Sequence, residues 1–250
     1  MAISVDKVYQ KVLALANKEQ RGYITPQEFN LFADHAQMNI FEQYFYDLSQ
    51  RQRVPGNDQE YADLVSNIEE KISMFEIRGA GISFNSEGEV NLIDLGDFYR
   101  LGNVRVLYAS NSKYETAELI KLSDIDKYES SPLAIYTKKR PVYSKYSSAM
   151  GSNTIRIYPT PQSTTSSSDT VLVNYIRKPS SPNWTYLISG SKNALYNPSA
   201  ADHNDFELHS SEENDLVLKI LQLAGISIKD LQLTGAAAQQ EMTTLQQEKQ

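Results

Sequence analysis

Cysteine is absent from the 250-residue sequence, so the chain can form neither a disulfide bond nor a thiolate metal site. The only histidines, His35, His203 and His209, lack the close spacing of metal ligands on a helix. No apolar run approaches the ~20 residues that span a bilayer, and no secretory signal is visible at the start. We therefore expect a soluble protein, made in a cytoplasm, with no metal, no cofactor and no membrane partner.

Positive charge is also in short supply. Lys and Arg total 24 against 31 Asp and Glu, which gives a net charge of −7, and the cations are scattered along the chain. Because contact with phosphates requires clustered cations, this distribution argues against a surface that grips nucleic acid. A mildly acidic wall would instead suit a passage through which DNA moves without sequence-specific contact.

Catalytic and nucleotide-binding motifs are missing as well. The sequence has no G-x-S-x-G, phosphate-binding loop or H-E-x-x-H, and the Gly-Ala-Gly at 79–81 lacks the rest of a dinucleotide loop. Adjacent glutamates at 69–70 and 212–213 lie in helical patterns, where solvated faces are the simpler interpretation. Residues 17–28 have the length of a calcium loop, but Arg21 occupies a ligand position. We therefore expect no enzyme.

The best-specified element is a long helix from Ile24 to about Arg53. Thr25, Pro26 and Glu28 form a helix start signal that includes a capping box. One apolar stripe of this helix contains Phe29, Phe32, Ala33, Ala36, Ile40 and Tyr44. A second seam, nearly opposite, contains Leu31, Met38 and Phe45. Two readings stay open: a central helix of an ordinary helical domain, or a helix shared with a neighbouring subunit.

Changes of pattern along the chain predict an α+β fold with an N-terminal helical bundle, an inserted antiparallel β domain and a C-terminal helix pair. The predicted parts are a bundle (1–75), a β domain (76–190), a return segment and helix that packs on the bundle (191–230), and a docking tail (231–250). The expected strands cover residues 90–95, 104–108, 116–122, 154–158, 170–178 and 184–188. Residues 162–169, nearly all Ser and Thr, are expected to form a solvated hairpin tip.

Particular runs of sequence carry a family likeness. They are VYQKVLALANKEQRGYITPQEFNLFADHAQMNIFEQYF at 8–45, TIRIYPTP at 154–161 with VLVNYIRKPSSPNW at 171–184, and LVLKILQLAGISIKDLQL at 216–233, before an Ala/Gln-rich tail. In this order, the runs and the parts resemble head–tail connector or adaptor ring proteins of tailed, podovirus-like phages. The likeness covers most of the chain but includes no catalytic signature.

The resemblance implies a structural protein at the portal vertex of the virion. Such proteins form a twelve-subunit ring beneath the portal protein, extend the DNA channel, and meet the next tail or nozzle protein. Their C-terminal helix docks on the portal, which here corresponds to Leu231, Leu233, Ala237, Met242 and Leu245.

A closed ring of identical subunits also requires two unlike faces on each copy. We therefore expect the seam of Leu31, Met38 and Phe45 to contact the neighbouring subunit.

An alternative function is a tail-associated module that recognises a glycan or receptor. The sequence contains sixteen tyrosines and one tryptophan, and amphipathic rings of this kind can stack on sugars. This alternative predicts that Trp184 and Tyr186 lie exposed in a groove of the β loops.

Overall fold

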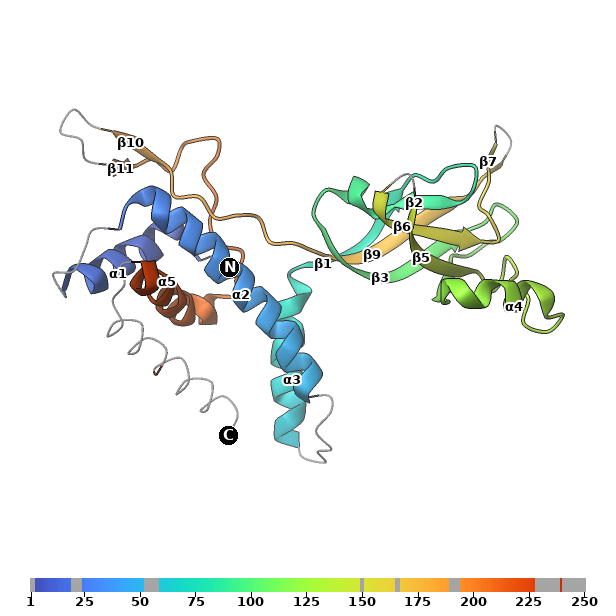
Figure 1. The fold of residues 1–250 in the computed structure, drawn as a ribbon, viewed down its shortest axis with the longest axis horizontal. Helices are drawn as coiled ribbons and strands as arrows, with labels where there is room; N and C mark the ends of the chain where they lie inside the picture. Colours follow the sequence, from blue (N-terminus) through green and yellow to red (C-terminus); the bar gives the residue numbers. More distant parts are fainter. Residues whose placement is uncertain are drawn as a thin grey trace. The chain divides into compact units, whose positions relative to one another are not determined.

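The computed structural model describes residues 3–18, 24–51, 59–148, 151–164, 167–188, 194–227 and 239. Over these residues the chain is a mixed α/β protein with five α-helices and a large, curled seven-stranded sheet (Figure 1). It divides into two compact units, one formed by Met1–Met74 with Pro179–Gln250 and the other by Phe75–Lys178. The β domain predicted from the sequence ends at residue 190, whereas the compact β unit ends at Lys178.

The first unit is helical. Its helices are α1 (Val5–Lys18), α2 (Pro26–Arg51), α3 (Gln59–Ser73) and α5 (Glu213–Ser227). Helix α2 contacts both α3 and α5, and α1 also contacts α5 (Figure 1). The helix near the end of the chain therefore packs against two helices from its beginning.

Helix α2 begins as its sequence predicts. The backbone N–H of Thr25 donates to a Glu28 carboxylate oxygen at 3.0 Å, and the Glu28 N–H donates back to Thr25 Oγ1 at 3.3 Å. The Thr25 N–H, together with the Thr25 hydroxyl, which donates to the same carboxylate at 2.8 Å, holds the pKa of Glu28 below its ordinary value. The predicted core stripe is also confirmed, since Phe29, Ala33, Ala36, Ile40 and Tyr44 are buried and Phe32 is half-buried.

Two amide side chains of α2 hold the irregular segment that follows the β unit. Gln37 is fully buried; its Nε2 donates to the Ser180 carbonyl at 2.8 Å, and its Oε1 accepts from the Glu207 N–H at 3.1 Å. Two turns earlier, Asn30 Oδ1 accepts from the Trp184 N–H at 2.9 Å. Because residues 180–184 and 207 lie outside regular helix or sheet ladders, these side chains satisfy backbone groups that would otherwise lack partners.

The start of the chain closes the same region. Ile3 and Phe206 form an antiparallel bridge, with both N–H···O distances at 3.1 Å. Beside it, the Val5 N–H donates to Asp205 Oδ1 at 2.9 Å, at the start of α1. Segments about two hundred residues apart in the sequence are thereby joined in one unit.

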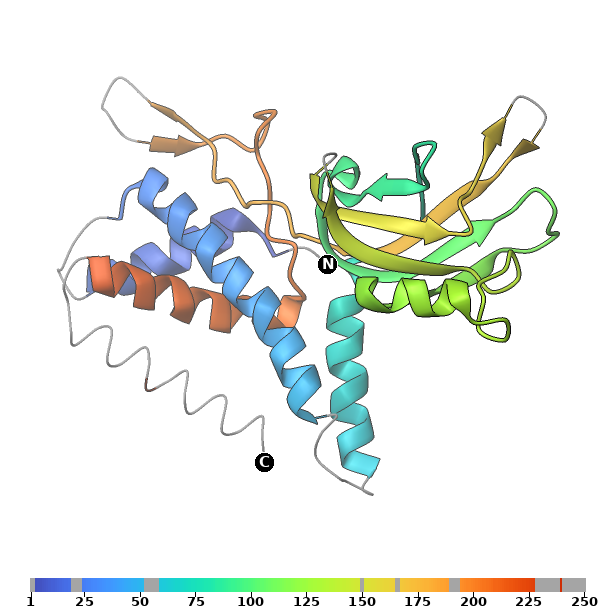
Figure 2. The same cartoon turned by 45° about the vertical axis from the view of Figure 1, so that its right-hand side comes forward.

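The second unit is the curled sheet, with strand order β1-β9-β3-β4-β5-β6-β2 (Figure 2). Its strands are β1 (Glu76–Ile82), β2 (Glu89–Asn91), β3 (Phe98–Leu107), β4 (Glu115–Leu119), β5 (Val142–Ser148), β6 (Gly151–Tyr158) and β9 (Thr170–Arg177). All neighbours are antiparallel except β4 and β5, which are joined by a crossover that contains helix α4 (Ile125–Ser130). A small hairpin, β7 (Ser163–Thr164) with β8 (Ser167–Ser168), lies in the Ser/Thr-rich segment.

The concave side of this sheet holds a separate hydrophobic core. Twelve buried side chains from six strands, the turn after β2 and the residue after β3 meet there: Val90, Leu92, Val104, Val106, Tyr108, Ala117, Tyr143, Ile155, Ile157, Val171, Val173 and Tyr175. Alternate residues of β9, from Val171 to Tyr175, point into it, as expected for a sheet with one buried face. The β unit thus has a core of its own.

We expect replacement of Gln37 with Leu to destabilise the helical unit by about 1–3 kcal/mol, because the Glu207 N–H and Ser180 carbonyl lose these partners without gaining water. Urea unfolding followed by circular dichroism measures the change. Gln10→Leu on α1 is the matched control, since Gln10 is exposed. Equal unfolding midpoints for the two variants would show that the Gln37 amide is not needed.

Candidate subunit interface

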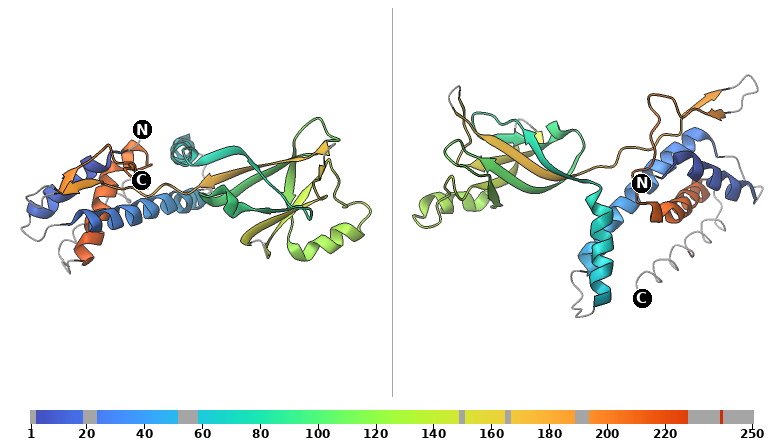
Figure 3. Two further views of the ribbon diagram at one scale, coloured as in Figure 1. Left: turned by 90° about the horizontal axis from the view of Figure 1, so that it is seen from above. Right: turned by 180° about the vertical axis from the view of Figure 1, so that it is seen from behind.

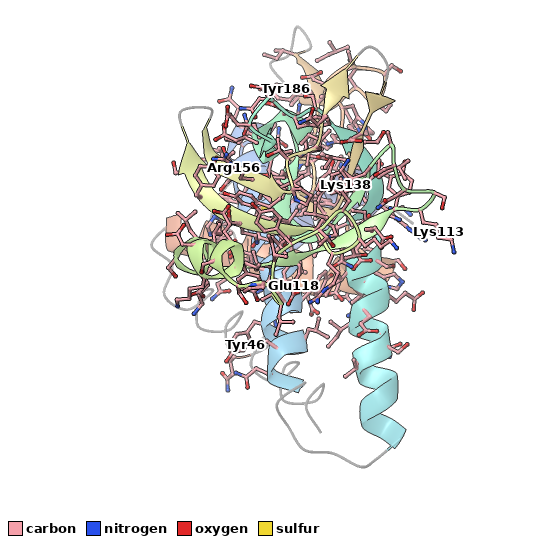
Figure 4. The ribbon with its side chains drawn as sticks, turned by 90° about the vertical axis from the view of Figure 1, so that its right-hand side faces the viewer. Tyr46, Lys113, Glu118, Lys138, Arg156 and Tyr186 are labelled. Atoms are coloured by element: carbon pink, nitrogen blue, oxygen red, sulfur yellow. The ribbon has the colours of Figure 1, made fainter. Side chains whose placement is uncertain are left out.

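A short hairpin extends from the helical unit and is the most exposed apolar element there. It consists of β10 (Tyr186–Ile188) and β11 (Ala194–Tyr196), which pair in register as Tyr186↔Tyr196, Leu187↔Leu195 and Ile188↔Ala194. Over the described residues, these two strands form a sheet of their own. Figures 1 and 3 show the hairpin pointing away from the helices, and Figure 4 labels Tyr186 on it. An isolated two-stranded hairpin is only marginally stable in water, so its root must be held.

Aromatic rings hold that root. Trp184 is only 3% exposed, and its ring stacks on those of Tyr186 and Tyr196 with centroids 5.8 and 5.7 Å away. The Trp184 ring also contacts the ring of Tyr9 of α1, with the centroids 4.4 Å apart. The Tyr9 ring in turn lies 4.7 Å, centroid to centroid, from that of Phe29 of α2. A continuous series of rings therefore connects the helical core to the base of the hairpin.

Hydrogen bonds fix the same root. Trp184 Nε1 donates to Asp6 Oδ1 at 3.0 Å, and the Tyr196 hydroxyl and His203 Nε2 are 2.8 Å apart. Burial, with a smaller contribution from nearby Asp205, raises the pKa of the Tyr196 phenol, so this hydroxyl stays protonated at neutral pH. With the Trp184 indole N–H and the Tyr196 hydroxyl both partnered, the root of the hairpin has a preset direction.

The outer part of the hairpin remains apolar and open. Leu187, Ile188 and Leu195 are 61%, 72% and 57% exposed. Leu187 and Leu195 stand opposite each other and therefore share one face, whereas the register places Tyr186 and Tyr196 on the other. Contiguous exposed apolar side chains on a projecting element indicate a contact surface for another molecule.

A hollow lies in the same unit, and we call it the Leu31 hollow. Its volume is about 870 Å³, and it is lined by the first turns of α2 and by the segments on either side of the hairpin: Gln27, Asn30, Leu31, Asp34, Ser181, Pro182, Asn183 and residues 201–204. Leu31 is 71% exposed there. The helical unit thus carries an outward apolar arm and an open apolar recess.

The structure separates the three residues of the predicted seam. Leu31 lines the hollow, whereas Met38 and Phe45 are half-buried, and the Phe45 ring meets Phe41 edge-on at 5.1 Å. On the same helix, the neighbouring Tyr46 is 58% exposed. Seven-residue spacing therefore does not produce one continuous exposed stripe, because part of the seam packs within its own unit.

Sequence reasoning missed the hairpin residues Leu187, Ile188 and Leu195 as contact candidates. A signal was present: Tyr-Leu-Ile and Ala-Leu-Tyr flank the polar, Gly-containing segment Ser-Gly-Ser-Lys-Asn, which is a typical hairpin pattern. The prediction instead assigned 184–188 to a further strand of the β domain. The predicted portal-binding residues, Leu231, Leu233, Ala237, Met242 and Leu245, lie outside the described residues.

On the β unit, an aromatic and charged cluster lies around β6. The Arg156 guanidinium is 5.4 Å from the Tyr158 ring centroid, which is 5.4 Å from that of Tyr136 (Figure 4 labels Arg156). The Tyr146 hydroxyl donates to Glu89, and burial raises the pKa of Tyr136 and Tyr146 to about 12. Both phenols are therefore protonated donors within an ordered network.

The ionisable side chains of the described residues bear on metal binding and on acid–base chemistry. No three His, Asp or Glu side chains among them gather closely enough to hold a metal ion. The carboxyl groups there with a resolved pKa shift all have it lowered, by hydrogen bonds from nearby donors: Glu28, Glu89 and Asp124. A general acid at neutral pH needs the opposite shift.

Comparisons with known proteins did not identify a relative from which a function could be inferred. No known protein family matches the chain, and a search of curated proteins found no match. Within the described ranges, no helix combines the length and the apolar character needed to cross a bilayer.

Trp184 is the only tryptophan of the sequence, so its fluorescence reports on the root of the hairpin. We expect emission typical of a buried indole, and acrylamide quenching several-fold weaker than in the urea-unfolded chain. Tyr9→Ala and Tyr196→Ala remove rings stacked on the indole and should shift the emission to longer wavelength. Tyr114→Ala in the β unit is the control, and an indole quenched as readily in the folded as in the unfolded chain would contradict this arrangement.

Proposed function

We propose that this chain is a structural protein of a tailed-phage virion, a subunit of the ring that joins the portal to the tail. The observation that carries the proposal is the firmly rooted hairpin with exposed Leu187, Ile188 and Leu195, in the same unit as the open Leu31 hollow. A protein that acts alone gains nothing from displaying such surfaces, whereas a subunit buries them on assembly. The likeness of the runs at 8–45 and 171–184 to connector proteins supports the same conclusion.

A cyclic assembly follows from the unlike character of the two surfaces. A projecting arm and a recess form a heterologous contact, in which each copy gives one surface and receives the other. Such contacts close into a ring when the rotation between copies divides a full turn. The family resemblance implies twelve copies, with the portal protein on one side and the next tail or nozzle protein on the other.

The finer arrangement belongs to this proposal. The N-terminal helices act as a bundle with the β domain inserted, and a second C-terminal helix follows α5. Leu231, Leu233, Ala237, Met242 and Leu245 on that segment bind the portal. The net charge of −7 suits a channel that lets genomic DNA slide, because an acidic wall does not hold phosphates. Nothing in this role requires catalysis or a cofactor.

The alternative, a tail module that reads a glycan, has less support. It needs the indole face of Trp184 free for a sugar ring, but Trp184 is 3% exposed and is stacked by Tyr9, Tyr186 and Tyr196. Its Nε1 is already bonded to Asp6. We therefore favour assembly over glycan recognition.

We expect the full-length protein to form a closed cyclic assembly whose mass is a whole multiple of 28.2 kDa. Native mass spectrometry gives the number of copies, and electron microscopy of negatively stained particles gives the symmetry. A monomer that persists at the highest soluble concentration, with purified portal rings added as well as without them, would refute the ring proposal.

We also expect no stable complex between this assembly and double-stranded DNA at physiological salt. The net charge of −7 opposes contact with phosphates, because it repels them over the molecule as a whole. Electrophoretic mobility of a labelled duplex across a series of salt concentrations tests this. A mobility shift that weakens steeply as salt rises would indicate a phosphate-binding surface and contradict the proposed channel lining.

A further inference from the structure

We infer that the β10–β11 hairpin of one copy inserts its Leu187 and Leu195 face into the Leu31 hollow of the next copy. The inference rests on the proposed ring and names the contact between its subunits. It is carried by the form of the arm, by the chemistry of the hollow and by the placement of both in the same unit.

The arm is suited to insertion because its direction is set before any partner arrives. The Trp184 ring is held by Tyr186 and Tyr196 on the hairpin and by Tyr9 on α1. A surface ordered in advance loses little conformational entropy on binding, so most of the gain from burying its leucines remains as affinity. Leu187 and Leu195 lie opposite each other, which concentrates the exposed apolar area on one face.

The hollow is suited to an apolar ligand because its main polar groups are already paired with one another. Asn183 Oδ1 accepts from Asn30 Nδ2 at 2.8 Å, and Asn183 Nδ2 donates to the Asp202 carbonyl at 2.9 Å. Asn204 Nδ2 donates to the Ser181 carbonyl at 3.0 Å. These amides of the lining are thus already partnered, whereas Leu31 and the adjoining Pro182 offer apolar surface.

The size and charge of the hollow also fit the hairpin. The hollow is open to solvent, and its volume of about 870 Å³ lies within the range of about 300–1,000 Å³ that ligand sites span. Its lining carries two carboxylates, Asp34 and Asp202, and no Lys or Arg. In the sequence of 186–196, the single charged residue is Lys192, a cation. In composition, a hairpin with one cation and no carboxylate therefore complements a lining with two carboxylates and no Lys or Arg.

The occupant is a hairpin from another copy because the chain's own hairpin leads away from its hollow. Residues 181–183 and 201–204, which line the hollow, are also the segments that enter and leave the hairpin. Figure 3 shows β10 and β11 directed outward from this region. Folding back would require the Trp184 stack to break. Each copy thus presents an arm that it cannot use itself and a recess that it cannot fill.

Two variants test the contact. Leu187→Asp with Leu195→Asp disables the arm, and Leu31→Asp disables the hollow; all three side chains are more than half exposed, so folding should survive. We expect each variant alone to be monomeric by native mass spectrometry, with unchanged circular dichroism and Trp184 fluorescence. Tyr46→Asp, at an exposed position of α2 outside the hollow, is the control and should still form rings.

Mixing the two disabled variants is the decisive step. One intact arm and one intact hollow remain in the mixture, so we expect a one-to-one dimer that cannot grow further. If either variant still forms normal rings, or if the mixture yields only monomers, the inference is wrong. If the wild-type protein forms rings and the variants form them too, the hairpin contact is wrong but the ring proposal stands. If the wild-type protein is a monomer, the ring proposal is wrong as well.

The absence of native cysteine allows a second, direct measurement. In the double variant Leu31→Cys with Leu195→Cys, mild oxidation should join neighbouring copies into a ladder on non-reducing gels. Each single variant should give no ladder beyond a dimer, because it supplies only one side of the contact. A double variant that assembles into rings but gives no ladder would place these residues far apart and overturn the inference.

Discussion

Hydrogen bonds from two amide side chains of α2, the buried Gln37 and the half-buried Asn30, determine how the helical unit is arranged. The chain between the β unit and α5 has little regular structure, and its backbone groups need partners inside the protein. Gln37 satisfies the Ser180 carbonyl and the Glu207 N–H, and Asn30 satisfies the Trp184 N–H. These bonds place the returning chain along α2. Without them, neither the aromatic root of the hairpin nor the walls of the hollow would have a fixed position.

This constraint couples the two surfaces of the proposed interface. Asn30 holds the segment that begins the hairpin, and the adjacent Leu31 lines the hollow. The arm and the recess are therefore built on neighbouring residues of one rigid helix. In a ring, the angle between successive copies depends on the relation between the donor and acceptor surfaces. Here that relation is set within a single turn of α2, so small changes in this turn would alter the curvature of the assembly.

Sequence patterns were informative where local rules decide the structure, and less so where distant contacts decide it. The start and core stripe of α2 followed from Thr25, Glu28 and the spacing of its apolar residues. Strand β1 was missed because Gly79, at a φ of 73°, breaks the apolar pattern, and the polar composition of β5 concealed that strand. Of the candidate site, heptad spacing singled out Leu31. The hairpin residues were not identified, because Trp184 is buried by rings from α1 and from both strands, a contact that no local pattern contains.

The two ends of the β unit lie next to each other and are joined by backbone hydrogen bonds. Its first and last strands pair from Glu76↔Ile176 onward, and the Arg177 N–H donates to the Phe75 carbonyl at 2.9 Å. Entry and exit are thus adjacent, and the unit between them has a core of its own. A segment with these properties can be exchanged, enlarged, or replaced by a tight turn, while α3 and the segment that begins at Pro179 keep their connection. The β unit can thereby vary while the helical unit keeps its own structure.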